Sequence, residues 1–250
     1  MVSRPAGVVS AAFGRTRSLL VMLTAVLACF VGAAPASAEW FGDVYLGGAF
    51  TSKQDVDVDA PGFPTLTFQD IKFDSSVTGG GRVGYWWEGP LQFLGLGLDI
   101  SHFAPNVGLQ TRTFCLAGFG CGTGTFGAID LSVTVIGFDA MFRYPLMKTP
   151  QFPNGQLQPY FTLGPAVFIA HAEDTINFFP FNQSDTDTKL GLKLGLGATW
   201  LFTKNIGMFG EYRFTHFSPE FTFNDSFLGK STLSTDVNTH HFLAGVSFRF

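Results

Sequence analysis

A glycine-rich hexapeptide is one stretch of this sequence whose residue types and spacing could do chemistry. Residues 79–84, GGGRVG, satisfy the G-x-G-x-x-G spacing with which a loop before a helix binds the pyrophosphate of a dinucleotide. That chemistry needs a helix N-terminus directly after the glycines. Here the alternating pattern of a strand continues through the motif to Trp87. Glycines inside a strand usually mark a bend or a close backbone approach. We therefore expect no nucleotide cofactor, and no other cofactor is indicated.

Two cysteines form the second candidate for chemistry. Cys115 and Cys121 lie six positions apart in the segment CLAGFGC. A metal site would need further ligands nearby, and residues 112–124 contain no His, Asp or Glu. Two nearby thiols in a loop usually pair in an oxidising compartment. We predict a disulfide between Cys115 and Cys121.

The N-terminal segment has the order of a secretory signal peptide. Arg4, Arg15 and Arg17 precede an apolar stretch from Leu19 to about Val31, and Ala36-Ser37-Ala38 follows as a small-x-small cleavage site. The apolar stretch is shorter than the roughly 20 residues that a membrane-spanning helix needs. We predict a signal peptide over residues 1–38 and a mature chain over residues 39–250. Because VLAC, residues 26–29, loosely resembles a lipoprotein lipobox, lipidation of Cys29 is the alternative.

The composition excludes several classes of protein. Of the 250 residues only 14% are charged, against roughly 25% in a usual soluble domain, while Phe and Gly number 30 each. A disordered chain would need low hydrophobicity and high net charge, but this chain is 46% hydrophobic with a formal net charge of −4. The low charge content and the negative net charge also argue against a coiled coil and against a nucleic-acid partner. It favours β-structure that faces apolar surroundings.

The elements that must position these residues follow from a period of two in the hydrophobic pattern. In LGLKLGLGATW, residues 190–200, the Leu and Trp residues fall on one face of a strand and Lys193 falls on the other. Each such segment is close to the 9–11 residues of a tilted membrane strand. Eight segments show the alternation: 43–50, 77–87, 94–102, 134–144, 160–170, 190–200, 206–218 and 240–250.

The connections between these segments alternate in length, as they do in membrane barrels. Short turns follow the second and sixth segments, although residues 145–158 form a long connection on the short side. The long connections are 51–75, 104–128, 173–187 and 219–238. We predict an all-β fold, an eight-stranded antiparallel transmembrane β-barrel with long external loops. The alternative is a soluble secreted β-sandwich or lipocalin-like barrel, which a Gly-rich face with few charges does not favour.

Charged residues fall on the face that the barrel would turn inward. Because an eight-stranded barrel is just wide enough for side chains to fill, these charges must be paired. We predict a salt-bridged plug, with Arg249 at the mouth; a narrow conducting pathway is the alternative. The predicted charge network of the lumen comprises Asp43, Arg82, Asp99, Asp139, Arg143, Lys193, Glu211 and Arg213.

Two segments near the end of the chain carry a family resemblance. GEYRFTHF, residues 210–217, and the ending HHFLAGVSFRF resemble the seventh and last strands of the OmpA-like and Opa-type outer-membrane β-barrel family. The resemblance covers roughly residues 39–250, and the chain stops at the barrel, so we expect no peptidoglycan-binding domain. It implies a location in the bacterial outer membrane among lipid and lipopolysaccharide. It also implies that the assembly machinery of that membrane recognises the last strand through Phe248 and Phe250.

A histidine and a serine two positions apart share the outward face near the external rim. His216 and Ser218 are similar in arrangement to the site of the outer-membrane lipid A deacylases, which implies a serine nucleophile activated by a histidine base. That family has Asn after the serine, where this chain has Pro219. An orienting acid is not evident among Glu220, Asp225 and Asp236. Polar residues at the headgroup level are the simpler interpretation.

The leading hypothesis is therefore a non-enzymatic outer-membrane barrel with a structural or surface-exposed role in the cell envelope. A lipid A deacylase-like esterase that uses Ser218 and His216 is the first alternative, and a small passive pore is the second. The loop at residues 51–75 carries five Asp against two Lys, so we expect a solvated acidic surface that could meet an extracellular ligand.

Overall fold

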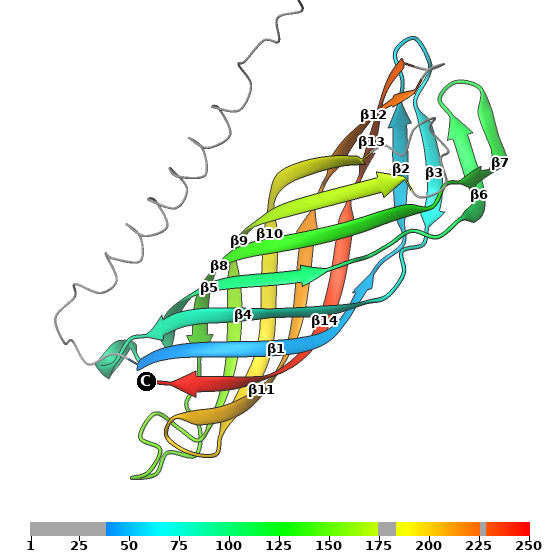
Figure 1. Cartoon of the computed structure of the whole chain (residues 1–250). Helices are drawn as coiled ribbons and strands as arrows, with labels where there is room; N and C mark the ends of the chain where they lie inside the picture. The colour runs from blue at the N-terminus through cyan, green and yellow to red at the C-terminus, as the bar shows by residue number, and fades with distance from the viewer. Residues whose placement is uncertain (1–38, 175–183, 226–228) are drawn as a thin grey trace, which may run out of the picture. The chain divides into compact units, whose positions relative to one another are not determined.

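The computed structural model describes residues 39–174, 184–225 and 229–250 (Figure 1). The predicted signal peptide, and with it Cys29, lies outside these ranges. Residues Glu39–Phe250 form one folded unit. In the part of the chain that is described, no helix is long and apolar enough to cross a membrane.

Eight long strands close into an antiparallel barrel, which confirms the predicted fold class (Figure 1). β1 pairs with β14 on one side and with β4 on the other, so the barrel has no free edge. A short 3₁₀ turn, Gly89–Leu91, joins β4 to β5. The barrel strands are β1 (Glu39–Thr51), β4 (Ser76–Trp86), β5 (Leu94–Phe103), β8 (Ile129–Arg143), β9 (Leu157–Asp174), β10 (Ser184–Leu201), β11 (Ile206–Phe217) and β14 (Val237–Arg249).

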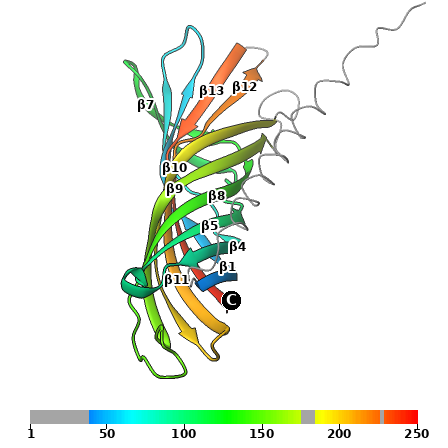
Figure 2. The same ribbon diagram turned by 90° about the vertical axis from the view of Figure 1, so that its left-hand side faces the viewer.

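The external connections carry strands of their own, where the sequence pattern predicted only loops. They form a six-stranded sheet in the order β12-β13-β2-β3-β6-β7 beyond one end of the barrel (Figure 2). These hairpins are ordered because they bury apolar residues such as Val56, Phe68 and Leu233. Their strands are β2 (Gln54–Asp59), β3 (Leu66–Ile71), β6 (Gln110–Leu116), β7 (Gly120–Phe126), β12 (Glu220–Asp225) and β13 (Gly229–Thr235).

The inside of the barrel is layered. Along β1, Phe41 belongs to an apolar cluster at the inner end, Asp43 carries charge, and Ala49 belongs to a second apolar cluster. The second cluster joins the outer half of the barrel to the six-stranded sheet, and within it the rings of Phe168 and Phe217 stack with centroids 4.4 Å apart. The charged side chains of the lumen thus interleave with the first apolar cluster, and the second apolar cluster lies beyond them toward the external sheet.

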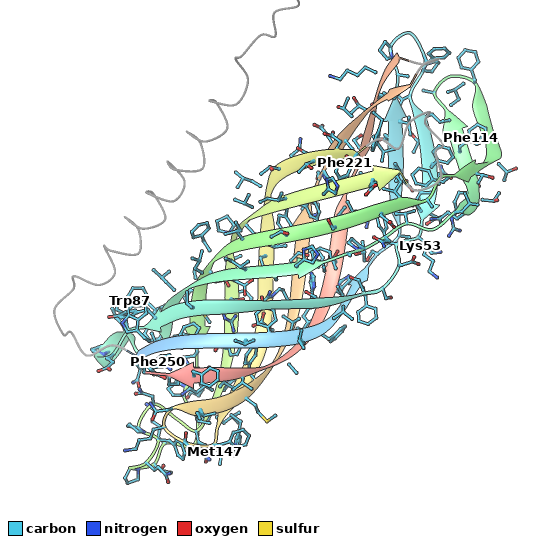
Figure 3. The ribbon with its side chains drawn as sticks, viewed as in Figure 1. Lys53, Trp87, Phe114, Met147, Phe221 and Phe250 are labelled. Carbon is cyan, nitrogen blue, oxygen red and sulfur yellow. A yellow bond between two sulfur atoms is a disulfide. The ribbon has the colours of Figure 1, made fainter. Side chains whose placement is uncertain are left out.

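The outer surface of the barrel is apolar and ends in aromatic side chains at the inner end. Figure 3 shows Trp87 and Phe250 at the end of the barrel opposite to Phe114 and Phe221. Aromatic girdles of this kind mark the interfaces of a membrane barrel. The outward-facing aromatic residues at this end include Trp40, Tyr85, Trp87, Tyr144, Trp200 and Phe250.

The long inner connection at residues 145–158 folds back on the barrel. Leu146 pairs with Leu157 in an isolated bridge, and Asn154 donates a hydrogen bond of 3.0 Å to Glu39 at the start of β1. Gly155 has a φ of +86°, and a Cβ there would lie 2.7 Å from the carbonyl oxygen of Leu146. The turn therefore requires glycine at this position.

Candidate functional site

The charged residues of the lumen are the most concentrated chemical feature of the structure. Asp43, Asp99, Asp139 and Glu211 supply carboxylates, and Arg82, Arg143, Lys193 and Arg213 supply cations. All eight are at most 5% exposed. Six barrel strands contribute them, because alternate residues of a strand point to the same side.

Arg82 is the first centre of the network. Its Nε and Nη2 donate to Asp43 Oδ2 at 3.0 and 2.8 Å, and its Nη1 donates to Glu211 Oε2 at 2.9 Å. Ser247 donates a 2.6 Å hydrogen bond to the other oxygen of Asp43. The guanidinium carbon also lies 5.4 Å from the centre of the Tyr160 ring, whose hydroxyl donates to Glu211 at 2.8 Å.

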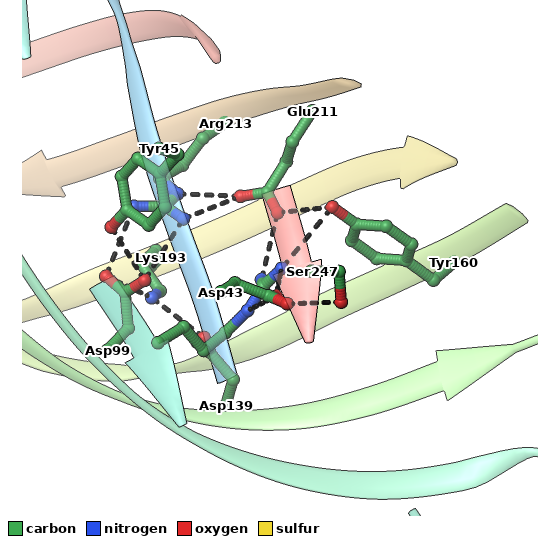
Figure 4. A network of polar contacts seen from close by, with 10 residues as sticks. Asp43, Tyr45, Asp99, Asp139, Tyr160, Lys193, Glu211, Arg213 and Ser247 are labelled. Carbon is green, nitrogen blue, oxygen red and sulfur yellow. Dashed lines mark hydrogen bonds and ion pairs between the residues drawn. The ribbon is translucent and has the colours of Figure 1, made fainter. Parts of the chain in front are cut away.

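Arg213 and Lys193 extend the network across the lumen. Arg213 donates to Glu211 at 2.8 Å and to Asp99 at 3.2 Å, and it also donates to the Tyr45 hydroxyl at 2.9 Å. Lys193 Nζ lies 3.0 Å from Asp99 Oδ1 and 2.8 Å from Asp139 Oδ2. Four carboxylates and three cations therefore form one connected set of ion pairs, as the dashed lines of Figure 4 trace.

Arg143 lies apart from this set. Its Nη2 is 2.7 Å from Glu39 Oε2, and its Nη1 donates to Gln158 at 3.2 Å. Glu39 also approaches Arg249 Nε at 3.6 Å. The network predicted from the sequence grouped Arg143 with the central charges and omitted Glu39. Glu39 lies four positions before Asp43 on the same strand, so the alternation of side chains could have assigned it to the inside. Tyr160 and Ser247 were also omitted, because neutral hydroxyls stand out less than charges.

The two loop cysteines belong to the external sheet. Cys115 on β6 and Cys121 on β7 are directly opposite each other, with Cα atoms 4.0 Å apart, and form a disulfide. The bond ties the two strands of this hairpin together.

His216 and Ser218 point outward at the external rim but do not act on each other. His216 Nδ1 lies 2.8 Å from Asn238 Oδ1, whereas the Ser218 hydroxyl donates to Asp236 Oδ1. No hydrogen bond joins His216 to Ser218 in the described residues. A histidine base must reach the hydroxyl that it activates, so this arrangement is not poised for acyl transfer.

Ser218 instead lines a polar pocket of about 360 Å³ next to the external sheet. The pocket carries the carboxylates of Asp55, Asp57, Glu220 and Asp236. Across the described ranges, no group of three or more His, Cys, Asp or Glu side chains is arranged to hold a metal ion. The pocket is thus an acidic surface feature.

The last strand ends on the lipid-facing side. Phe248 and Phe250 are both exposed outward, Phe250 to 79%. The backbone N–H of Phe250 donates to the carbonyl oxygen of Trp40 at 3.0 Å, so the final residue lies at the seam between β14 and β1. These positions fit the predicted assembly signal, which stays a prediction.

The two edges of the external sheet differ. At β12, the backbone N–H groups of Glu220 and Thr222 donate at 2.7 Å to the carboxylates of Asp187 and Asp185, which close that edge. At β7, pairing within the described residues is with β6 alone. β7 also lacks the charged residues that are one of the devices for blunting an exposed edge.

Comparison with known proteins places this architecture. A family model described as outer membrane protein beta-barrel domain matches residues 23–250. The solved structure of OprG from Pseudomonas aeruginosa is 13% identical, with 85% of this chain and 96% of that chain covered and a TM-score of 0.56. A major outer membrane protein from Thermus thermophilus is 15% identical, with 86% and 100% covered and a TM-score of 0.51. At these identities the likeness is one of fold. No curated protein matches the chain.

Proposed function

Because this chain belongs to the outer membrane protein beta-barrel domain family and lies in the bacterial outer membrane, we propose that it is a non-enzymatic, sealed barrel that anchors a β-sheet at the cell surface. The anchor is the closed eight-stranded wall, and the functional part is the six-stranded sheet built from the external connections. The proposal separates a structural role for the lumen from a presenting role for the sheet.

The ion-paired layer of the lumen carries the proposal. An ion that crossed the barrel would have to pass Asp99, which contacts both Lys193 and Arg213, and Glu211, which contacts both Arg82 and Arg213. Separating buried pairs leaves charges without partners, at a cost of several kcal/mol each. The apolar cluster beyond this layer adds a second barrier, because it is packed with side chains such as Phe103, Phe168 and Phe217.

The surface sheet supports the presenting role. Its cross-strand disulfide and its shared core with the barrel hold the β6–β7 hairpin in place. An extended segment of a partner can add to an exposed sheet edge through backbone hydrogen bonds. Since carboxylates close the β12 edge, β7 is the edge at which the proposed presentation would meet an extracellular protein.

Conductance in planar lipid bilayers tests the sealed lumen. The purified, folded protein should add no steady current at either polarity, because the ion pairs and the apolar cluster block the path. Insertion is verified separately by protease protection of the same protein in vesicles, so that silence is not mistaken for failure to insert. A steady, ion-selective conductance from the wild-type protein would favour the small passive pore instead.

A further inference from the structure

Most histidines of this protein lie at one height of the barrel, near its outer end, on strands spread around its wall. Of five in the chain, His241 is buried in the lumen, whereas the other four face outward toward the outer end of the barrel. Each of these four makes a hydrogen bond to the neighbouring strand through Nδ1. The pairs are His102 with Thr134 at 3.1 Å, His171 with Thr186 at 2.8 Å, His216 with Asn238 at 2.8 Å and His240 with Tyr212 at 2.7 Å.

Two of these histidines lie at the outer edge of the apolar band. On β14, His240 is ten residues from Phe250 at the inner end, and on β11, His216 is ten residues from Ile206. Ten residues of a strand tilted by roughly 40° rise about 25 Å, which is the height of the lipid-facing band of a membrane barrel. The two imidazoles therefore lie where the acyl chains end and the lipid headgroups begin.

His216 and His240 are close enough to contact one group together. Phe214 is directly opposite His240, and His216 is directly opposite Asn238, so the two histidines are diagonal neighbours on adjacent strands. Such positions are about 7 Å apart, within reach of long side chains. With Nδ1 of each ring held by the neighbouring strand, Nε2 is the nitrogen left to gain a proton and to meet a ligand.

We propose that His216 and His240 form a binding site for the phosphate group of an outer-leaflet lipid, and that they bind it more tightly as the pH falls. A protonated imidazole donates from both nitrogens and attracts an anion. In the described strands of the barrel, the arginines and Lys193 point into the lumen and Lys189 is paired with Glu220. The imidazoles are therefore the cations that the lipid-facing surface can offer at this depth.

The surroundings of the pair are compatible with an anionic ligand. β10 presents Leu190 and Leu192 beside His216, and β1 presents Phe50 beside His240. The nearby charged groups are Asp236, Glu220, Asp187 and Lys189, which lie toward the external sheet. Asp236 accepts a hydrogen bond from the Ser218 hydroxyl, and Lys189 pairs with Glu220 at 2.7 Å and with Asp187 at 3.7 Å. The inference does not depend on whether the lumen conducts.

Native mass spectrometry of the folded protein in zwitterionic detergent tests the proposal. The probes are diphosphorylated lipid A and the same lipid without its phosphates, each titrated at about pH 6 and about pH 8. Binding of the phosphorylated lipid should be about tenfold tighter at the lower pH, because a protonated imidazole attracts the phosphate. The double variant His216→Gln, His240→Gln should lose this preference. His102→Gln is the matched control, since His102 has the same Nδ1 bond but no second histidine on a neighbouring strand.

Several outcomes would overturn the inference. The first is binding of the dephosphorylated lipid as tight as that of the phosphorylated lipid. The second is a pH preference that persists in the double variant. The third is a loss of the pH preference in His102→Gln as large as that in the double variant. Competition by inorganic phosphate at equal molar concentration would assign the site to the free anion and not to a lipid. Folding of each variant is checked on a gel, where the folded barrel migrates differently from the heated, unfolded protein. If the double variant does not fold, the two single variants should each lose part of the pH preference. No loss in either would contradict the proposal.

Discussion

At the scale of single residues, the lumen shows how charges are tolerated inside a narrow barrel. Arg82 and Arg213 each contact two carboxylates, and Lys193 likewise contacts two acids. Because all of these groups are removed from water, each depends on the others for compensation. The arrangement stabilises the folded state only as a complete set.

Arg213→Leu tests this dependence. Removal of the guanidinium leaves Asp99 and Glu211 short of a partner in the lumen, so the free energy of unfolding should fall by roughly 3–5 kcal/mol. Urea unfolding of the refolded protein in lipid vesicles measures the change. Lys189→Met is the control, since its ion pair with Glu220 is at the surface and should contribute little. An Arg213 variant as stable as the wild type would argue that the charges do not form a cooperative network.

At the scale of elements, the alternation along each strand separates lipid from lumen. On β10, Leu190 and Leu196 are 76% and 63% exposed on the outer surface, whereas Lys193 is buried on the inner one. A soluble barrel with the leucines in its core would show the reverse. The depth of a residue along the strand then determines how much a charge there would cost.

A pair of substitutions on β10 measures that depth. Leu196→Arg places a charge near the middle of the apolar band and should cost roughly 2–4 kcal/mol, while Leu190→Arg, close to the outer edge, should cost about 0–1 kcal/mol. Both variants change the same residue type on the same strand, so each controls for the other. The measurement is again urea unfolding in vesicles. Equal costs would contradict the placement of the band, and a negligible cost at Leu196 would contradict contact with lipid.

At the scale of the whole molecule, the barrel and its external sheet act as one unit. Their apolar residues form one cluster, in which Phe217 at the end of β11 and Phe221 on β12 both take part. The rim between them holds Ser218, whose hydroxyl is oriented by Asp236 and not by His216. This geometry supports the proposal that the protein resides among the lipids of the outer membrane without altering them.

Lipid A from cells that express the protein tests this expectation. The number of acyl chains, measured by mass spectrometry of extracted lipid A, should be the same as in cells without the protein, because the Ser218 hydroxyl is bonded to Asp236 and not to a histidine base. Cells that express Ser218→Ala provide the matched comparison. Loss of one acyl chain in the presence of the wild-type protein but not of Ser218→Ala would establish the esterase alternative.

The sequence by itself determined the architecture of the wall. A period of two over eight segments identified the barrel strands, and parity assigned Asp43, Arg82 and Glu211 to the inside, because side chains alternate across any strand. The same local rule placed Leu190 and Leu196 on the lipid face. The short spacing between Cys115 and Cys121 also predicted their disulfide, since the segment around them offers no other metal ligands.

Only the tertiary structure decided how distant segments meet. Parity shows that Arg82 and Glu211 point inward, but their contact across 129 positions depends on the register of every strand between them. For the same reason Arg143 proved to contact Glu39 at the inner mouth, and Ser218 proved to contact Asp236 and not His216. The six external strands are short, and their pairing into one sheet could not be identified from the sequence because it depends on how the hairpins pack on one another and on the barrel core.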